Sequence, residues 1–545
     1  MMRRSFHKII ADRLSTSTAN RRLARLNRQL LLKAKPDGAR PTVAFFVAST
    51  RLVGMSLNAA FSYLAACGLQ AAGYPVVYFA CHAGMSRCVL GTNKDDSAQR
   101  PPCKACIAQS ERLFQHAPAV WFEYAEDREV KHALTDLGIA DLINFEFPMI
   151  LAGDEVILPL GELVLPSLRW ALRRHNLMDD ESTRFLYREY VLSAWRVAHE
   201  FERFLAEVEP TVVVVFNGIL FPEAAVRWVA RRRGLRVITH EVGFRPFSGF
   251  FTDEDATAYP LEIPPDLELS EDQNEKLDAY LERRFQGKFT MAGIRFWPDI
   301  QPLDHGFLCK AERFTQIVPV FTNIIYDTSQ VHANNIFQDM FAWLDAVHEL
   351  IRAHPETLFV IRAHPDEVRP GKKSRESVQD WVKNHNVESR SNVIFVNSDE
   401  QLSSYELIER SKFVMVYNSS IGLEAALLGK VVLCGGEARY SSHNIVINPA
   451  SGEDFRQKAE ELLSSRELLR LQPASCENAR KFMYYQIFEA SLPFEDFLEQ
   501  ATRPGYVRLK PFSWQQLRPE ASATMRVLVD GIVHGKPFLM DSLQS

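Results

Sequence analysis

The sequence contains no long hydrophobic run and no strong excess of charge. Over its 545 residues no apolar stretch reaches the roughly 18 to 20 residues that span a bilayer, and the Arg-rich start has no continuous apolar segment of the kind that directs secretion. The 63 Lys and Arg residues nearly balance 68 Asp and Glu residues, for a net charge of -5. Because a nucleic-acid binder needs a basic surface, this balance argues against a nucleic-acid partner. We expect a cytoplasmic globular protein.

Cysteines are also few, eight in all, and a cytoplasmic chain is not expected to pair them in disulfides. Four of them crowd one polar stretch, the Cys-rich insert 81–106: Cys81, Cys88, Cys103 and Cys106. The Cys103-x-x-Cys106 pair has chelate spacing, so the four thiols could form a tetrahedral structural zinc site. The gaps between the other cysteines match no standard zinc motif, and plain thiols or a redox pair are the alternative.

Positive charge gathers at the start of the chain. Residues 1–41 hold eleven Lys or Arg against two Asp, and the blocks FHKIIADRL and RRLARLNRQLLLKAK can form basic amphipathic helices. Such helices suit peripheral association with an anionic membrane, here the inner face of the cell membrane, although a solvated arm would have the same composition. We predict a basic helical arm over residues 1–40.

From residue 41 onward, short β-branched runs alternate with amphipathic stretches of helix length, which is the pattern of parallel α/β units. Runs such as VVVVF (212–216) are apolar at every position, so helices must cover both faces of the sheet. The predicted strands lie in TVAFFVAST, YPVVYFAC, TVVVVFNG and LRVITHEVG of a first half, and in TQIVPVFTN, TLFVIRAHP, SNVIFVNS, KFVMVYNS and KVVLCGG of a second. The sequence predicts an α/β protein of two doubly wound, Rossmann-like domains that face a cleft.

The domain bounds follow from these patterns. We predict a first domain over residues 41–300, which includes the Cys-rich insert, and a second over 301–485, with an acidic helical connector before the boundary. Residues 486–545 form a C-terminal extension that could return across the first domain.

The stretch VYNSSIGLEAALLGKVV holds the first candidate site. A buried strand ends in Asn418, Ser419 and Ser420, where a helix N-cap belongs, and their hydroxyl and amide donors could hold a phosphate. Glu424 lies one residue too far along to close a capping box, so it is available to accept from the hydroxyls of a ribose. An ordinary solvated helix acid is the alternative.

The stretch FVIRAHPDE provides a second strand end, with Arg362 and His364 at the same crevice. His364 could donate to a phosphate. The loop FTNIIYDTS adds Asn323 and Asp327, which could touch a nucleotide or sugar, although loop polarity explains them equally well.

In the first half, HEVGF ends a strand at the proposed cleft. Glu241 is the best-placed general base toward an acceptor hydroxyl, and His240 is second. Alternatively, Glu241 pairs with Arg245.

Together, RAHPDE, YNSSIGLEAALLGKVVL and the Tyr-containing GGEARYS resemble the carboxyl-terminal half of bacterial capsule polysaccharide biosynthesis proteins, including capsular Kdo transferases, and the His-Pro and Ser-Ser motifs of polysialyltransferases. The resemblance covers roughly residues 315–445. It implies the two-domain GT-B architecture, with His364, Ser419 and Ser420 on the nucleotide phosphate and Glu424 on the ribose. HEVGF is similar to the acid-acid-Gly base motif of those transferases, with Val242 in place of the second acid.

The resemblance implies a GT-B glycosyltransferase that moves a sugar from a CMP- or UDP-linked donor, held by the second domain, to a glycan or glycolipid acceptor presented by the first. No cofactor is expected for catalysis, because helix-terminus donors and His364 could neutralise the leaving phosphate. The alternatives are a nucleotide-sugar 2-epimerase of the same architecture and a non-catalytic scaffold of a polysaccharide assembly complex.

Overall fold

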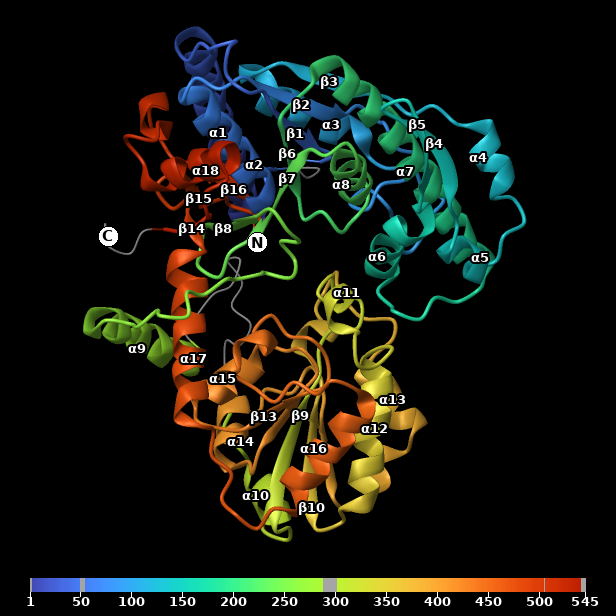
Figure 1. The fold of residues 1–545 in the computed structure, drawn as a ribbon, viewed down its shortest axis with the longest axis vertical. Coiled ribbons are helices and arrows are strands. Elements are labelled where there is room, and N and C mark those ends of the chain that lie inside the picture. The colour runs from blue at the N-terminus through green and yellow to red at the C-terminus, as the bar shows by residue number, and fades with distance from the viewer. Residues whose placement is uncertain (1, 50–53, 288–300, 504, 541–545) are drawn as a thin grey trace.

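The computed structural model describes residues 2–49, 54–287, 301–503 and 505–540, with side chains described from residue 17 onward. Within these ranges the chain forms two α/β domains, one above the other in Figure 1, each built around a parallel sheet. The fold is the predicted GT-B-like arrangement of two Rossmann-like domains. All nine strands predicted from the sequence are present.

The described part of the first sheet has the strand order β14-β8-β7-β6-β1-β2-β3. Its strands are β1 (Val43–Val47), β2 (Val76–Cys81), β3 (Ala119–Phe122), β6 (Val212–Phe216), β7 (Arg236–Val242), β8 (Ser248–Thr252) and β14 (Leu492–Pro493). Strands β3, β2, β1, β6 and β7 pair in parallel, whereas β8 is antiparallel to both β7 and β14. Every residue of β1 is buried, as expected for a strand covered on both faces.

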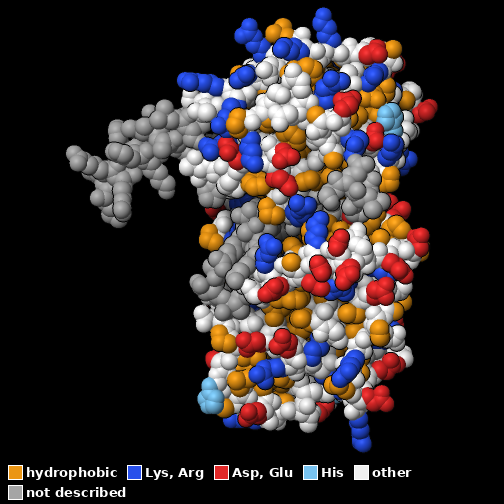
Figure 2. All heavy atoms as spheres, turned by 90° about the vertical axis from the view of Figure 1, so that its left-hand side faces the viewer, with side chains coloured by type: hydrophobic (Ala, Val, Ile, Leu, Met, Phe, Trp, Pro, Cys, Tyr) orange, Lys and Arg blue, Asp and Glu red, His pale blue; other side chains and the backbone are white. Residues whose placement is uncertain are grey.

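One face of this sheet is covered by segments from both ends of the chain. They are α1 (Met2–Lys33), α2 (Leu57–Ala71), the hairpin β15 (Leu498–Gln500) and β16 (Val507–Leu509), and α18 (Ala523–His534). The basic arm forms one continuous helix, and its Leu26 and Leu30 are buried in this core. Figure 2 shows the outer side of this region, where Lys and Arg side chains stand along the upper end and hydrophobic side chains are scattered among charged ones.

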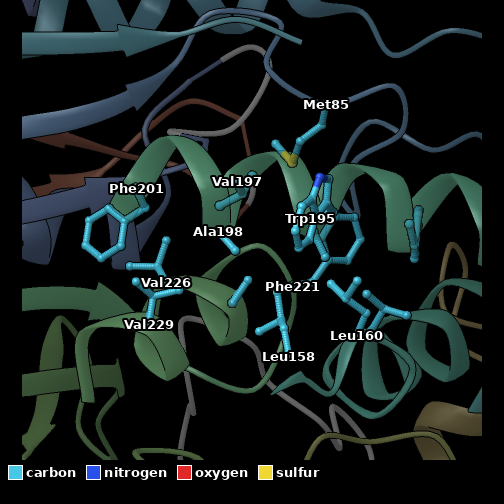
Figure 3. Packing of buried hydrophobic residues seen from close by; sticks show 14 of the residues in the cluster. Met85, Leu158, Leu160, Trp195, Val197, Ala198, Phe201, Phe221, Val226 and Val229 are labelled. Carbon is cyan, nitrogen blue, oxygen red and sulfur yellow. The ribbon is translucent and has the colours of Figure 1, made fainter. Parts of the chain in front are cut away.

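The other face carries the remaining elements of the first domain. These are α4 (Arg128–Ala133), α5 (Ile139–Ile143), the hairpin β4 (Phe147–Leu151) and β5 (Asp154–Leu158), α6 (Leu160–Leu172), α7 (Glu181–Val208) and α8 (Glu223–Arg232). Helix α3 (Cys103–Leu113) instead lies on the α1 side, where the Asn27 side chain donates to the Arg112 carbonyl at 2.8 Å and Leu113 joins the core. Figure 3 shows α7 lying across this core, with Phe201 near Val226 and Val229 of α8. The carboxylate of Asp180 caps α7 by accepting from the Thr183 amide.

The second sheet, as described, is fully parallel, with the order β11-β10-β9-β12-β13. Its strands are β9 (Gln316–Phe321), β10 (Thr357–Arg362), β11 (Val393–Val396), β12 (Val414–Val416) and β13 (Val432–Cys434). One face packs on α12 (Met340–Ala353), α13 (Val378–Asn384) and α16 (Gly452–Ser464), and the other on α9 (Glu271–Phe285), α10 (His305–Ala311), α14 (Ser404–Arg410), α15 (Ile421–Leu427) and α17 (Pro473–Tyr484). The short α11 (Gln330–Ala333) follows β9.

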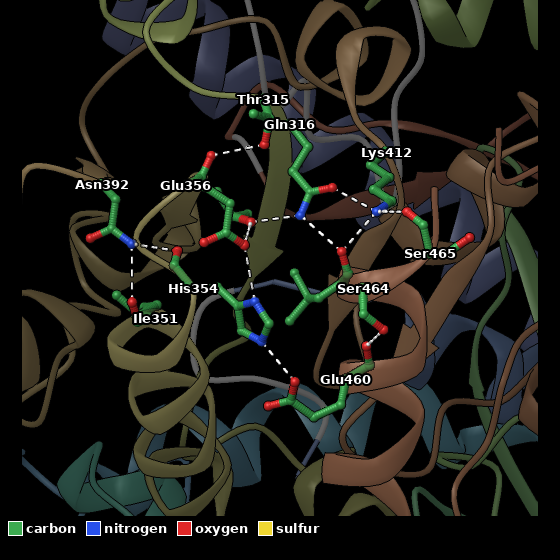
Figure 4. A network of polar contacts seen from close by, with 12 residues as sticks. Thr315, Gln316, Ile351, His354, Glu356, Asn392, Lys412, Glu460, Ser464 and Ser465 are labelled. Atoms are coloured by element: carbon green, nitrogen blue, oxygen red, sulfur yellow. Dashed lines mark hydrogen bonds and ion pairs between the residues drawn. The ribbon is translucent and has the colours of Figure 1, made fainter. Parts of the chain in front are cut away.

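At the edge where β9 and β10 begin, the second domain holds a dense polar network (Figure 4). The Lys412 ammonium donates to Gln316 Oε1 at 2.6 Å and to two backbone carbonyls, Leu463 at 2.9 Å and Ser465 at 2.7 Å. Nearby, His354 lies 2.7 Å from Glu460. We call this group the amino-edge network.

The two domains contact each other beside the cleft. Glu376 of the second domain accepts from the His175 and Asn176 amides at 2.9 and 3.1 Å and from the Asn176 side chain at 2.6 Å. Thr257 of the first domain lies 2.9 Å from the His332 ring nitrogen of the second. None of the described helices combines the length and hydrophobicity needed to cross a bilayer.

Candidate active site

The cleft between the domains contains a cavity of about 510 Å³. Its walls come from the carboxyl ends of strands in both sheets, which is where open α/β sheets bind ligands. The cavity brings together all the sequence-predicted site residues except His240 and the four cysteines: Glu241, Asn323, Asp327, Arg362, His364, Asn418, Ser419, Ser420 and Glu424. The volume falls in the range of small-molecule sites.

Glu241 is the acid that the first domain contributes to the cavity. Its carboxylate accepts from the Asn58 and Asn217 side-chain amides at 2.8 and 3.0 Å and from the Val242 amide at 2.9 Å. Burial raises the pKa of Glu241, and these three donors oppose that shift. A carboxyl group with a raised pKa, fixed at a cavity wall, is suited to receive a proton. The alternative pairing with Arg245 does not occur, because Arg245 instead lies 3.3 Å from Glu495.

The interpretation of His240 as a second candidate base is wrong. Successive side chains of a strand point to opposite faces, so Glu241 and His240 of β7 cannot both face the cavity. The His240 ring is fully buried on the α2 side, with Nε2 2.7 Å from the Ser62 hydroxyl and the ring stacked near Phe251. Burial lowers the pKa of His240 to about 3.

His364 faces the cavity from the end of β10. Its Nδ1 accepts from the Asp366 amide at 3.2 Å, and burial lowers the pKa of the ring. In the neutral ring with Nδ1 as acceptor, the proton lies on Nε2, which is then a donor. Arg362, two residues earlier, is buried, and burial lowers its pKa to about 10.

The Asn418-Ser419-Ser420 turn lines the cavity at the end of β12. Ser420 occupies the N-cap position of α15, but its hydroxyl makes no capping hydrogen bond in the described structure. Because α15 has only seven residues, its dipole adds little. The turn is held from outside the helix, since the Tyr440 hydroxyl donates to the Ser419 carbonyl at 2.5 Å. A Cβ atom at Gly422 would lie 2.2 Å from that hydroxyl, so glycine is required there.

The loop after β9 supplies Asn323 and Asp327. The Asn323 side-chain amide donates to Asn418 Oδ1 at 2.7 Å, which ties this loop to the serine turn. Asp327 Oδ1 accepts from the Ser329 amide at 3.1 Å.

Glu424 is not the free carboxylate predicted from the sequence. It is 3% exposed and lies 2.6 Å from the Arg284 guanidinium of α9, and it also accepts from the Tyr405 hydroxyl. Glu424 is therefore neither a solvated helix acid nor a carboxylate left without partners for a ribose. A buried carboxylate needs a cation or several donors, and Glu424 has both kinds of partner. Glu424 and both its partners still line the cavity, so the whole group is a wall that a ligand meets.

Sequence reasoning missed several residues of the cavity wall, including Asn58 at its Glu241 side and Trp170, Tyr259, Arg284, Tyr405 and Arg439 on the wall itself. Arg284 is separated from its partner by 140 positions, so no local pattern announces it. Arg439 lies in GGEARYS, a stretch singled out only for its tyrosine.

The four cysteines of the insert line a separate cavity of about 30 Å³ in the first domain. The Cys81 and Cys88 sulfurs each accept from a glycine amide at 3.2 Å, Gly84 and Gly91 respectively. Burial raises the pKa of Cys88 to about 12. Among the described residues, no group of three or more His, Cys, Asp or Glu side chains is placed to hold a metal ion. The zinc site stays a prediction.

The structure thus defines a two-domain α/β protein of GT-B-like fold with a polar cavity between its domains. Within this chain, residues 308–470 match the family described as "Capsule polysaccharide biosynthesis protein". The resemblance inferred from RAHPDE and YNSSIG is thereby confirmed over these residues. They include all five strands of the second sheet but not α9 and α17, which pack on that sheet.

Similar proteins were found by sequence and by structure. Protein FixF of Sinorhizobium fredii is 31% identical over 110 residues, which are 20% of this chain and 24% of that protein. The chain thus spans about a quarter of this curated relative. The β-Kdo 2,4-transferase KpsC of Thermosulfurimonas dismutans is 15% identical over 52% of this chain and 80% of that chain, with a TM-score of 0.33. The UDP-GlcNAc 2-epimerase of Neisseria meningitidis, bound to UDP-GlcNAc, is 13% identical over 81% and 98%, with a TM-score of 0.27.

Proposed function

We propose that this protein is a glycosyltransferase of capsule or related surface polysaccharide synthesis, which transfers a sugar from a CMP- or UDP-linked donor to a glycan or glycolipid acceptor. One observation carries the proposal: a single interdomain cavity joins a carboxylate of the first domain, Glu241, to the donors of the second, His364 and the 418–420 turn. The family match over residues 308–470 supports it from the sequence.

The residues divide into two roles in this proposal. The second domain holds the donor, with His364 Nε2–H and the Ser419 and Ser420 hydroxyls on the phosphate. The Glu424–Arg284 pair and Tyr405 form the wall toward the nucleoside. The first domain presents the acceptor hydroxyl to Glu241.

In the transfer step, the bond between the anomeric carbon and the phosphate oxygen breaks, and its electron pair stays on the phosphate. The acceptor hydroxyl oxygen forms the new bond to that carbon, and its proton passes to Glu241. The step requires a base of raised pKa on one side and hydrogen-bond donors for the departing phosphate on the other. We also propose that these side chains carry out the step without a catalytic metal ion.

A thermal-shift and calorimetry screen with CMP, CDP, UDP and GDP tests the donor half of the proposal. A ligand that binds the native state raises its apparent stability, so one nucleotide should shift the unfolding temperature and bind in a saturable way. His364→Ala should weaken that binding about tenfold, as expected for one charge-assisted hydrogen bond. If none of the four nucleotides binds, the transferase proposal fails and the scaffold reading is favoured.

Incubation with the corresponding nucleotide sugar separates transferase from isomerase. A transferase releases nucleotide in step with glycosylation of an added acceptor. An epimerase converts the nucleotide sugar in the absence of any acceptor, and NMR of the products shows which occurs.

We further propose that α1 docks the protein on an anionic membrane. Arg21, Arg25 and Arg28 are exposed at helical spacing, and the neighbouring Leu31 and Leu32 are each 60% exposed, while the opposite side packs into the first domain. A basic face beside exposed leucines suits an anionic lipid surface. Changing all three arginines to Gln should reduce sedimentation with phosphatidylglycerol vesicles severalfold at low salt. Equal sedimentation of the two proteins would refute membrane docking.

A further inference from the structure

The cavity wall contains one half-buried cation, Arg439, that has no counter-ion among the described residues. Arg439, in the loop after β13, lines the cavity, and its Nε is buried without a hydrogen-bond partner. Among the described residues its guanidinium makes no ion pair, and its contact is with the ring of Phe244, 4.5 Å from the guanidinium carbon to the ring centroid. Burial lowers the pKa of Arg439, a cost of removing this charge from water.

Other arginines of the same wall are arranged differently. Arg284 has the carboxylate of Glu424 at 2.6 Å, and Arg369 has that of Asp366 at 3.2 Å. A guanidinium carries five donors, and a stacked ring satisfies none of them by hydrogen bonding. A buried donor without an acceptor is costly, and the guanidinium of Arg439 faces the cavity without a counter-ion, so its donors indicate an anionic ligand.

The position of Arg439 identifies which anion it can reach. The next residue, Tyr440, donates to the Ser419 carbonyl, so the loop that carries Arg439 is fastened to the serine turn. On the other side, Phe244 follows Glu241 by three residues in the first domain. The Tyr259 ring packs 4.7 Å from that of Phe244, and its hydroxyl donates to the Val242 carbonyl at 2.8 Å. Arg439 therefore lies between the serine turn and the segment that follows the end of β7, the strand that carries the candidate base.

We propose that Arg439 binds the phosphate of the donor nucleotide. Its positive charge then stabilises the negative charge that this phosphate gains as the sugar leaves. The inference rests on the proposed function and adds to it a leaving-group residue that the sequence motifs do not contain. The guanidinium carbon of Arg439 lies over the Phe244 ring of the first domain, so phosphate binding at Arg439 should depend on how closely the two domains approach each other.

The test compares a nucleotide with its own nucleoside by calorimetry, using whichever of CMP, CDP, UDP or GDP binds the wild-type protein. In Arg439→Met the advantage of the nucleotide over the nucleoside should fall about tenfold to a hundredfold, because a charge-assisted hydrogen-bonded pair is lost. Arg439→Lys should recover part of this advantage, since it keeps the charge but not the planar fork. If Arg439→Met does not fold, Arg439→Gln replaces it.

Arg245→Met is the matched control. Arg245 also lies near an aromatic ring, Phe488, at 6.0 Å, but it has a carboxylate partner in Glu495 and does not line the cavity. Its loss should leave the nucleotide advantage unchanged. A purely structural role for Arg439 would lower the unfolding temperature while the nucleotide advantage stayed at the wild-type value, and that result overturns the inference alone. A wild-type protein that binds no nucleotide overturns the proposed function and this inference together.

Discussion

In the second sheet, polar side chains at the amino edge, where the strands begin, are arranged differently from those at the carboxyl edge, where the strands end. At the amino edge, Lys412 has three acceptors within 2.9 Å, provided by Gln316, Leu463 and Ser465. At the carboxyl edge, Arg439 is half-buried, and its buried Nε has no acceptor among the described residues. Buried polar groups are normally satisfied, so the first arrangement is what stability alone produces and the second is what a binding site leaves open.

This difference separates residues that stabilise the second domain from residues that bind the ligand. Amino-edge substitutions should cost stability and leave ligand binding unchanged, because that edge lies at the far end of the strands from the cavity. Carboxyl-edge substitutions should affect binding or transfer, and those that break the buried Glu424–Arg284 pair should also cost stability.

Glu241→Gln should have the largest effect. The amide keeps the shape of the side chain but cannot take the acceptor proton, so we expect the rate of sugar transfer to fall about 100- to 10,000-fold. Nucleotide affinity should stay within about twofold, because Glu241 faces the acceptor side. Transfer assays and calorimetry measure the two quantities. Glu254→Gln, an exposed acid on the same domain, is the control, and equal transfer rates in both variants would refute the assignment of the base.

Glu424→Ala should cause the largest loss of stability. It leaves the Arg284 guanidinium buried without its carboxylate, and breaking a buried pair in this way costs about 3 to 5 kcal/mol in the free energy of unfolding. Denaturant unfolding measures the change. The double variant with Arg284→Met should recover part of the loss, because no charge then remains buried. A loss below about 1 kcal/mol in the single variant would contradict a buried pair.

Lys412→Met should destabilise the amino edge moderately. Its three acceptors lose their donor while remaining partly reachable by water, so we expect a loss of about 1 to 3 kcal/mol. Nucleotide binding by the folded variant should equal that of the wild type. A weakened nucleotide affinity would break the proposed division between the two edges.

Glu367→Gln should change how stability depends on pH. Burial raises the pKa of Glu367 to about 7, while the Val378 amide and the Ser398 hydroxyl donate to its carboxylate. The folded state therefore binds this proton more tightly than the unfolded state, whose carboxyl has an ordinary pKa near 4.5. Its contribution is complete below about pH 4.5 and is lost as the pH rises through 7, by roughly 2 to 3 kcal/mol.

The glutamine variant should remove this pH dependence, so the unfolding free energies of the two proteins should converge or cross between pH 5 and pH 8. Urea unfolding at a series of pH values measures the difference. A difference between the two proteins that does not vary with pH would show that Glu367 does not titrate in this window.

The sequence predicted the elements that depend on local pattern. Apolar runs bounded by turns located all nine strands named in advance, and the strand-end rule brought Glu241, His364 and the serine turn to one cavity. The edge strand β14 and its neighbour β8 were missed because β8 contains glycine and β14 has only two residues, so neither has a readable periodicity.

The failures at the site have physical causes of another kind. His240 and Glu241 differ by one position, and only the strand register decides which of them faces the cavity. Glu424 was predicted to be free because its partner Arg284 lies far away in the sequence, in α9. A local motif gives no sign of such a long-range pair. The role proposed for Arg439 depends on the lack of a counter-ion among the described residues around it, and only a three-dimensional structure shows this.

Strand β14 affects the order in which the protein can fold during its synthesis. This strand pairs with the edge of the first sheet at Ser248 and Gly249, and α18 packs against α2 near the start of the chain. A ribosome must therefore synthesise the second domain before the last pieces of the first are available. Fragments that end at the domain boundary would expose the apolar surface meant for those pieces, so expression of the first domain alone should give aggregated protein unless residues beyond 490 are fused back to it.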